Sequence, residues 1–304
     1  MPKTLPTPAA PPQQVTRGVL AIKPFRKLWN SMVFSSLGDW LGLLATTALA
    51  QQLSGGDYAK ANFAIAGVFI ARLLPAVFLG PIAGVIADKL DRRKLMVNCD
   101  ILRTALYISI PIFHNYFWLY TAMILVECIT LFWSPAKEAS VPNLVPRDKL
   151  ESANQVSLLA AYGTAPVAAA LFTFLSLFTS AFNAAFSFDL TAVDLALYAN
   201  ALSFAFAAFT VWGLREIPKG AAAKHAAETG VLKSLHEGWK SVSTSKLIRG
   251  LIVGMVGAFV AAGAVIGLAR TFVGDLGGGE AAYGVLFGAV FTGLAFGIAL
   301  GPTI

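Results

Sequence analysis

Charged residues are scarce in this chain of 304 residues, where Asp, Glu, Lys and Arg together make up only 13%. A soluble domain usually carries about 25% charged residues, because it must cover a surface that faces water. Hydrophobic residues make up 57% here, and the few charges lie in clusters between long apolar runs. Such an arrangement is typical of membrane proteins. We therefore predict an all-α fold, a polytopic membrane helical bundle whose first partner is the lipid bilayer.

Cysteine and histidine are also rare, with two and three copies. Cys99 and Cys128 lie near or inside apolar segments without the spacing of metal ligands, so we expect packing residues. The histidines fall in separate polar segments, and no Gly-x4-Gly-Lys-Ser/Thr phosphate-binding loop is present. We predict no catalytic residue, no cofactor and no metal site, and we do not expect this chain to be an enzyme.

Apolar runs divide the chain into four regions. Residues 1–30 are predicted to be a disordered cytoplasmic leader with a basic, aromatic approach to the membrane, and they lack the apolar core of a secretory signal. Residues 31–214 are predicted to form a six-helix half. Residues 215–249 are predicted to be a cytoplasmic linker, and residues 250–304 to be two further helices. The expected membrane helices span 31–51, 61–87, 95–113, 117–133, 153–180, 195–214, 250–269 and 283–304.

Two polar stretches carry further expectations. Residues 134–151 are expected to be a cytoplasmic loop. In the linker, apolar residues recur at helical spacing and predict an amphipathic helix on the inner membrane face. These residues are Val231, Leu235, Trp239 and Val242.

The distribution of positive charge predicts the orientation. Nineteen of the 23 Lys and Arg residues lie in the leader and in the segments after the second, fourth and sixth helices, whereas Lys60 and Arg270 lie on the opposite side. Lys and Arg concentrate in cytoplasmic loops of membrane proteins. We therefore expect a multi-pass protein of the inner membrane with a cytoplasmic N-terminus, and we expect no nucleic-acid partner despite the net charge of +7.

One short basic turn resembles a known motif. The pattern Gly84-x-Ile86-Ala87-Asp88-Lys89-x-Asp91-Arg92-Arg93 resembles the loop between helices 2 and 3 of the major facilitator superfamily. Asp91 stands where the general pattern has glycine, as in the drug-exporter and siderophore-exporter branch. The resemblance implies a conformational role for Gly84, Asp88, Lys89, Arg92 and Arg93. In this family the aspartate latches one state against the positive end of a later helix, while the basic residues alternatively serve only as orientation signals.

A weak internal repeat suggests how much of that fold is present. Gly55-Gly56-Asp57 and Gly278-Gly279-Glu280 each precede a helix with glycines four residues apart. The two places resemble the corresponding openings of two six-helix halves. We therefore expect a major facilitator fold truncated after about eight transmembrane helices, that is, a fragment.

Ionisable residues inside apolar segments are the candidate transport residues, because such groups are expensive in a membrane and usually functional. Asp39, Arg72 and Glu127 lie near the middle of the first, second and fourth predicted helices. We expect one or both of Asp39 and Glu127 to bind a proton in one conformation and release it in the other. The alternative for Asp39 is a fixed buried ion pair with Arg72.

Other residues in the helices have predicted structural roles. Asp100 and Arg103, three residues apart, are expected to form a local ion pair. Gly80 is expected to allow close helix packing, and Pro75 and Pro166 are expected to kink their helices. Around Pro166 the sequence resembles an antiporter motif, but alanine replaces both of its glycines, so the motif leaves antiport and symport open.

The resemblance implies a monomeric, proton-coupled exporter that moves a small molecule outward by alternating access. An alternative remains, because residues 34–47 and 125–138 are also similar to the membrane half of actinobacterial polypeptides that carry a cytoplasmic thymidylate kinase. In that case this chain would be the membrane-anchoring region of a larger protein. The kinase residues would lie outside it.

Overall fold

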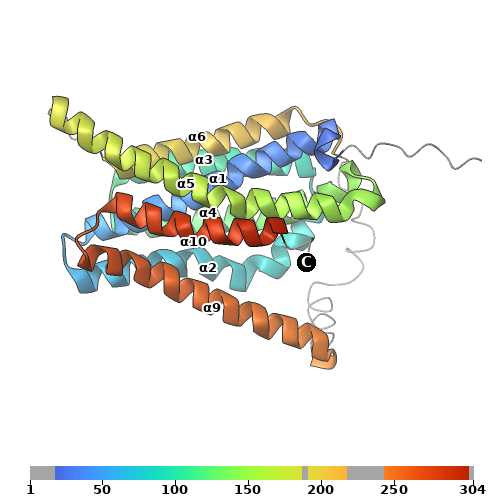
Figure 1. Cartoon of the computed structure of the whole chain (residues 1–304). Coiled ribbons are helices and arrows are strands. Elements are labelled where there is room, and N and C mark those ends of the chain that lie inside the picture. The colour runs from blue at the N-terminus through green and yellow to red at the C-terminus, as the bar shows by residue number, and fades with distance from the viewer. Residues whose placement is uncertain (1–17, 187–190, 218–242, 301–304) are drawn as a thin grey trace, which may run out of the picture.

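The computed structural model describes residues 18–186, 191–217 and 243–300, and every regular element within these ranges is a helix. Eight of these helices are long (Figure 1). The all-α prediction is therefore confirmed, while the predicted amphipathic helix around Val231 lies outside the described residues. The long helices are α1 (Lys23–Leu53), α2 (Tyr58–Lys89), α3 (Arg92–Phe113), α4 (Tyr116–Leu144), α5 (Leu150–Phe186), α6 (Ala192–Trp212), α9 (Lys246–Asp275) and α10 (Glu280–Leu300).

Six stretches among the described residues, one in each of α1 to α6, are long and apolar enough to cross a membrane. Helices are the natural solution there, since a backbone in lipid must satisfy its own hydrogen bonds. The connections between successive helices from α1 to α5 are correspondingly short, and side chains cap the starts of several helices. Asp57 accepts a hydrogen bond from the Lys60 backbone N–H at 3.0 Å, and Asn115 accepts one from the Trp118 backbone N–H at 2.8 Å.

The prediction of a cytoplasmic loop over residues 134–151 is wrong for most of its length. Helix α4 continues through Pro135 and Pro142 to Leu144, and only a short connection with a 3-10 turn (Arg147–Lys149) precedes α5. Packing explains the extension, because Leu144 is buried in the same core cluster as Phe25 and Met96. Tertiary contacts thus maintain a helix that hydropathy and two prolines had suggested would stop.

The helices pack around α1, which lies between α5 and α6. In the same bundle α3 packs on α6 and α4, and α2 packs on α4. Helix α10 covers α5, whereas α9 has few contacts with α2 and α10 and diverges from α2 along its length (Figure 1). The first six long helices therefore form the body on which any central site must be built.

Glycine allows α1 to approach α6 closely. A Cβ on Gly42 would lie 2.5 Å from Asn200 Nδ2 and 2.7 Å from Tyr107 Oη. A Cβ on Gly38 would lie 2.6 Å from Asn200 Oδ1 and would also meet the Ser203 hydroxyl. Real Cβ atoms do not come this close to other atoms, so both positions require the absence of a side chain.

Candidate transport site

The centre of the bundle is a buried arginine, Arg103 of α3, whose side chain has no exposed surface. It forms an ion pair with Asp100 one turn earlier on the same helix, and the Asp100 side chain is also fully buried. A second carboxylate, Asp39 of α1, lies 3.9 Å away, measured from Arg103 Nη1 to Asp39 Oδ1. One guanidinium is therefore shared by two carboxylates from different helices.

Uncharged groups complete the surroundings of Arg103. Its Nη2 donates a hydrogen bond to Ser35 Oγ at 3.2 Å, and its Cζ lies 4.3 Å from the Phe204 ring centroid and 5.0 Å from that of Trp133. Trp133 Nε1 donates to Asp100 Oδ2 at 3.2 Å, while Arg103 binds the other oxygen. Cation–π contacts of this kind gain strength when water is excluded. The Asp100–Arg103 pair is thus enclosed on every side and held in one geometry.

Asp39 differs from that pair in its access. Its side chain retains 34% of its accessible surface, while those of Asp100 and Arg103 retain none. The Arg103 Nε and Nη1 atoms make no hydrogen bond within the described residues. These two nitrogens of the guanidinium can therefore donate to Asp39 when it approaches, while Nη2 stays bound to Asp100 and Ser35. Asp39 is therefore the carboxylate of this centre whose charge can change without opening the core.

Arg72 of α2 and Glu127 of α4 belong to the same charged region. The charge of Arg72 acts on both Asp39 and Glu127, and Glu127 and Asp39 also interact with each other electrostatically. Arg72 Nη1 is buried and has no hydrogen-bond partner among the described residues. The ion pair that the structure gives Asp39 is with Arg103 rather than with Arg72, which was the alternative from the sequence.

Lys137 and Trp133 are members of this region that the sequence analysis missed. Lys137 Nζ lies 5.7 Å from the Trp133 ring centroid and 3.8 Å from Glu138 Oε1, and its charge also acts on Asp39. The spacing of four residues between Trp133 and Lys137 would have revealed a shared helix face. That signal was lost because residues 134–151 were predicted to be a loop.

A second missed group consists of Tyr107 of α3 and Asn200 of α6. Both side chains are fully buried, and both face Gly42. The Tyr107 ring also stacks on Phe204, with centroids 5.5 Å apart. Asparagine in the middle of an apolar run, with glycines on a neighbouring helix, was the available sequence signal.

The structure places the basic-turn motif across the end of α2 and the start of α3. Gly84, Asp88 and Lys89 lie in α2, and their side chains are outside what the structure describes. Asp91 caps α3 by accepting a hydrogen bond from the Lys94 backbone N–H at 3.1 Å. An N-cap is a preferred position for aspartate, which gives a local reason for this residue in place of the glycine of the general motif.

The two arginines of the motif differ in burial. Arg92 is buried and donates from Nη1 to the Ala139 carbonyl of α4 at 3.1 Å, whereas Arg93 is only partly covered. Arg92 thus ties the start of α3 to the extension of α4.

The predicted packing and kink residues lie within continuous helices. Helix α2 contains Pro75 and Gly80, and α5 contains Pro166. No described atom lies within 4 Å of where a Cβ on Gly80 would be, in contrast to Gly38 and Gly42. Among the described residues, no group of three or more His, Cys, Asp or Glu side chains could hold a metal ion.

A bundle of membrane-length helices with opposite charges enclosed at its centre is typical of secondary carriers. The comparison with protein families agrees, since the model of the family called transmembrane secretion effector (MFS_3) matches residues 16–303. The chain belongs to this family of the major facilitator type. The predicted fold and membrane character are thereby confirmed.

Curated relatives are also transporters by name. The chain is 31% identical over 44% of its length to the uncharacterized MFS-type transporter YfiS of Bacillus subtilis, and 29% identical over 49% to Rv0037c of Mycobacterium tuberculosis. It is 31% identical to macrolide efflux protein A of Enterococcus faecalis over 25% of each chain. The matched stretches cover 31% and 34% of the first two relatives, about a third of their length. The kinase fusion stays a prediction.

Proposed function

We propose that this protein is part of a proton-coupled exporter in which Asp39 takes up and releases the proton. The observation that carries the proposal is the contrast in access between the Asp39 side chain, 34% exposed, and the fully enclosed Asp100–Arg103 pair. A carboxylate that exchanges protons must reach water in some conformation. Its counter-ion must stay in place while it does so.

Charge balance supports this assignment. The centre holds the carboxylates of Asp39, Asp100 and Glu127 and the cations of Arg72 and Arg103, while Lys137 at its edge lies beside the exposed carboxylate of Glu138. Protonation of Asp39 changes the net charge of this centre by one, and an unbalanced charge is costly inside a membrane. A conformational change or a bound substrate that restores the charge balance is thereby coupled to the uptake of the proton. Arg103 remains paired with Asp100 in both states, so the core does not have to unfold.

Glu127 is proposed as a second protonatable group on the same route. It is half-buried on α4, and Arg72 supplies the largest electrostatic attraction that it experiences. Arg72 lies within electrostatic range of both carboxylates, so the state of one alters the field at the other.

The direction of transport and the class of substrate are proposed from the relatives. Macrolide efflux protein A is named for the efflux of macrolides, and we propose a small, partly hydrophobic cargo for this chain. We also propose that the protein acts as a monomer. Its basic helix ends would face the cytoplasm, and Asp88 would serve as a conformational latch.

The experiment is transport by the full-length protein in proteoliposomes with an imposed pH gradient, using erythromycin and ethidium as probes. Asp39→Asn should abolish gradient-driven accumulation while substrate exchange without a gradient persists, because the neutral amide removes only the proton step. Asp148→Asn, which neutralises an exposed carboxylate next to α5, is the matched control and should behave as the natural protein.

The variant Glu127→Gln distinguishes the role of Glu127 in proton coupling from that of Asp39. A partial loss of the response to the pH gradient would place Glu127 on the proton route beside Asp39. Gradient-driven accumulation that survives in Asp39→Asn, in protein shown to be folded, would overturn the role of Asp39. Failure of the natural protein to move either probe would contradict the proposed cargo class.

A further inference from the structure

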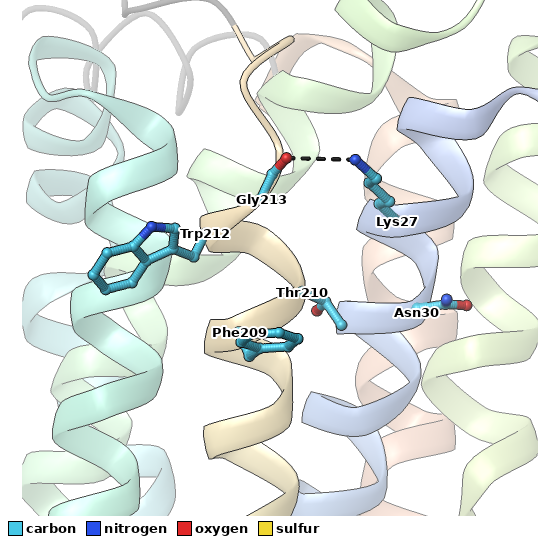
Figure 2. Close-up of a pocket in the computed structure, with 6 residues that line it drawn as sticks. All are labelled: Lys27, Asn30, Phe209, Thr210, Trp212 and Gly213. Carbon is cyan, nitrogen blue, oxygen red and sulfur yellow. Dashed lines mark hydrogen bonds between the residues drawn. The ribbon is translucent and has the colours of Figure 1, made fainter.

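Two hollows open on either side of the C-terminal end of α6, and both include Trp212. The larger has a volume of about 570 Å³ and lies between α6 and the start of α1 (Figure 2), and the smaller, of about 290 Å³, lies between α6 and the start of α3. The larger is lined by Lys27, Asn30, Phe209, Thr210, Trp212 and Gly213. The smaller is lined by Arg93, Lys94, Val97, Asn98 and Trp212.

The larger hollow is an apolar groove on the outside of a membrane-spanning helix. Phe209 is 77% exposed and Trp212 is 69% exposed, so both aromatic rings face the surroundings rather than the core. The Thr210 hydroxyl donates to the Ala207 carbonyl within its own helix at 2.8 Å and is therefore satisfied. At the rim, Lys27 Nζ lies 3.4 Å from the Gly213 carbonyl oxygen, to which it donates a hydrogen bond (Figure 2). The groove thus combines an apolar floor with a cation at one end.

The smaller hollow is positively charged. It lies beside the N-terminus of α3, which the Asp91 carboxylate caps, and its positive charge comes from the side chains of Arg93 and Lys94. Arg92 is buried and directed to the Ala139 carbonyl, and the Asp91 carboxylate caps the helix. Within the described residues, the side chains of Arg93 and Lys94 form no ion pair. Their charges therefore remain available to an anion.

We propose that these two hollows form one binding site for an anionic phospholipid. The phosphate lies at Arg93, Lys94 and Asn98, and one acyl chain lies in the groove beside Phe209. Trp212, which contributes to both hollows, sits between headgroup and chain, where tryptophan prefers to lie in membrane proteins. Charge complementarity selects an anionic lipid, because basic clusters at the membrane surface attract anionic headgroups. A bound lipid would link the ends of α1, α3 and α6.

The test is native mass spectrometry of the full chain in detergent, titrated with phosphatidylglycerol or with phosphatidylcholine of identical acyl chains. Phosphatidylglycerol should bind more tightly. Lys94→Gln should weaken its binding about fivefold, as expected for one cation near a headgroup, and Asn98→Asp should weaken it further by placing a carboxylate beside the phosphate. Trp212→Leu should weaken both lipids, because the ring contacts the chain as well as the headgroup.

Lys246→Gln, which removes an exposed cation at the start of α9 outside both hollows, is the matched control and should change nothing. Equal affinity for the two lipids would overturn the proposal. So would an equal loss in Lys246→Gln and Lys94→Gln, which would indicate general attraction to charge. Full competition by glycerol 3-phosphate would show a site for a soluble anion instead of a lipid. Lys94 and Asn98 are exposed, so both variants are expected to fold, and thermal melting checks this.

Discussion

The seam between α1 and α6 and the seam between α5 and α10 are equally extensive, and each depends on small residues, yet their surroundings differ. In the α1–α6 seam, Gly38 and Gly42 meet the side chains of Asn200 and Ser203. In the α5–α10 seam, Gly284 meets the Thr173 side chain and the Ala169 carbonyl oxygen, and Gly288 meets the Ala169 Cβ. The same packing device thus serves two different interfaces.

The α1–α6 seam is covered on both sides, because α5 also packs on α1 and α3 also packs on α6. It encloses Asn200, which is fully buried, and it adjoins Phe204, which stacks under Arg103. Opening this seam would expose polar and charged groups to lipid, where unsatisfied groups cost several kcal/mol each. We therefore expect α1 and α6 to move as one unit.

The α5–α10 seam has one covered side only. The opposite face of α10 leaves large apolar residues exposed, and these are Val285, Val290, Leu294 and Phe296. Separation there would uncover mainly apolar groups, which lipid solvates as well as protein does. Trp40 of α1 connects this seam to the first one. Its ring lies 4.4 Å from that of Phe291 and 5.8 Å from that of Phe287 on α10, and its Nε1 donates to the Ala161 carbonyl of α5 at 2.6 Å. Trp40 follows Asp39 directly in α1, so a movement of α10 would displace the residue next to the proposed proton site.

The largest expected effect on folding stability comes from removing the positive charge of Arg103 beside the α1–α6 seam. Arg103→Gln leaves Asp100 buried without its ion-pair partner, which should cost about 3–5 kcal/mol of folding free energy. The double variant Arg103→Gln/Asp100→Asn should recover much of this loss, because both charges are then absent. Unfolding in detergent measures the effect, with Arg147→Gln, an exposed arginine, as the control. Equal stability of Arg103→Gln and Arg147→Gln would contradict the buried pair.

Gly42→Ala should destabilise the seam itself by about 1–3 kcal/mol through overpacking against Asn200 and Tyr107. Gly163→Ala on α5 is the matched control, since no described atom lies within 4 Å of a Cβ there. A glycine in a helix interior costs roughly 0.5–1 kcal/mol relative to alanine, so the control should gain stability. Melting temperatures should therefore shift in opposite directions. A gain in both variants would show that α1 is not packed this closely on α6.

Gly284→Ala should loosen α10 on α5 without unfolding the six-helix body. The added Cβ would meet Thr173 and would lie 3.2 Å from the Ala169 carbonyl oxygen, so we expect a local cost on the order of 1 kcal/mol. Hydrogen exchange should increase in α10 but not in α6. Gly293→Ala on the same helix has free space around its Cβ among the described residues, so it should not increase exchange and should slow it slightly. Increased exchange in both α6 and α10 would remove the distinction between the seams.

The smallest effect is expected outside both seams, at the N-cap of α2. The pKa of the exposed Asp57 carboxyl is lowered from its ordinary value of 3.8, mainly because the carboxylate accepts a hydrogen bond from the Lys60 backbone N–H. A lowered native pKa stabilises the fold above the ordinary value, and this stabilisation is lost as the pH falls through the native pKa. Asp57→Ala should therefore lower the melting temperature slightly at pH 7 and have no effect in strong acid. A difference that persists in acid would show that ionisation of Asp57 is not its cause.

Much of the fold was predictable from the sequence, and the reason is visible in particular helices. Helices α3 and α6 begin within three residues of the predicted starts and end within two of the predicted ends. The Asp100–Arg103 pair was expected from spacing alone, since residues three apart share a helix face. By contrast, the extension of α4 to Leu144 depends on its burial beside Phe25 and Met96, which no local pattern contains.

What the sequence by itself determined is where this chain crosses a membrane, because the cost of an unpaired backbone in lipid turns each long apolar run into a helix. Tertiary structure alone decided which of the intramembrane charges share a partner. Asp39, Arg103 and Trp133 meet only because α1, α3 and α4 pack at particular depths and rotations. Contacts between helices follow no period along the chain, so a sequence pattern does not reveal them. The physical reason that these three helices meet is the fit of glycines and aromatic rings between them.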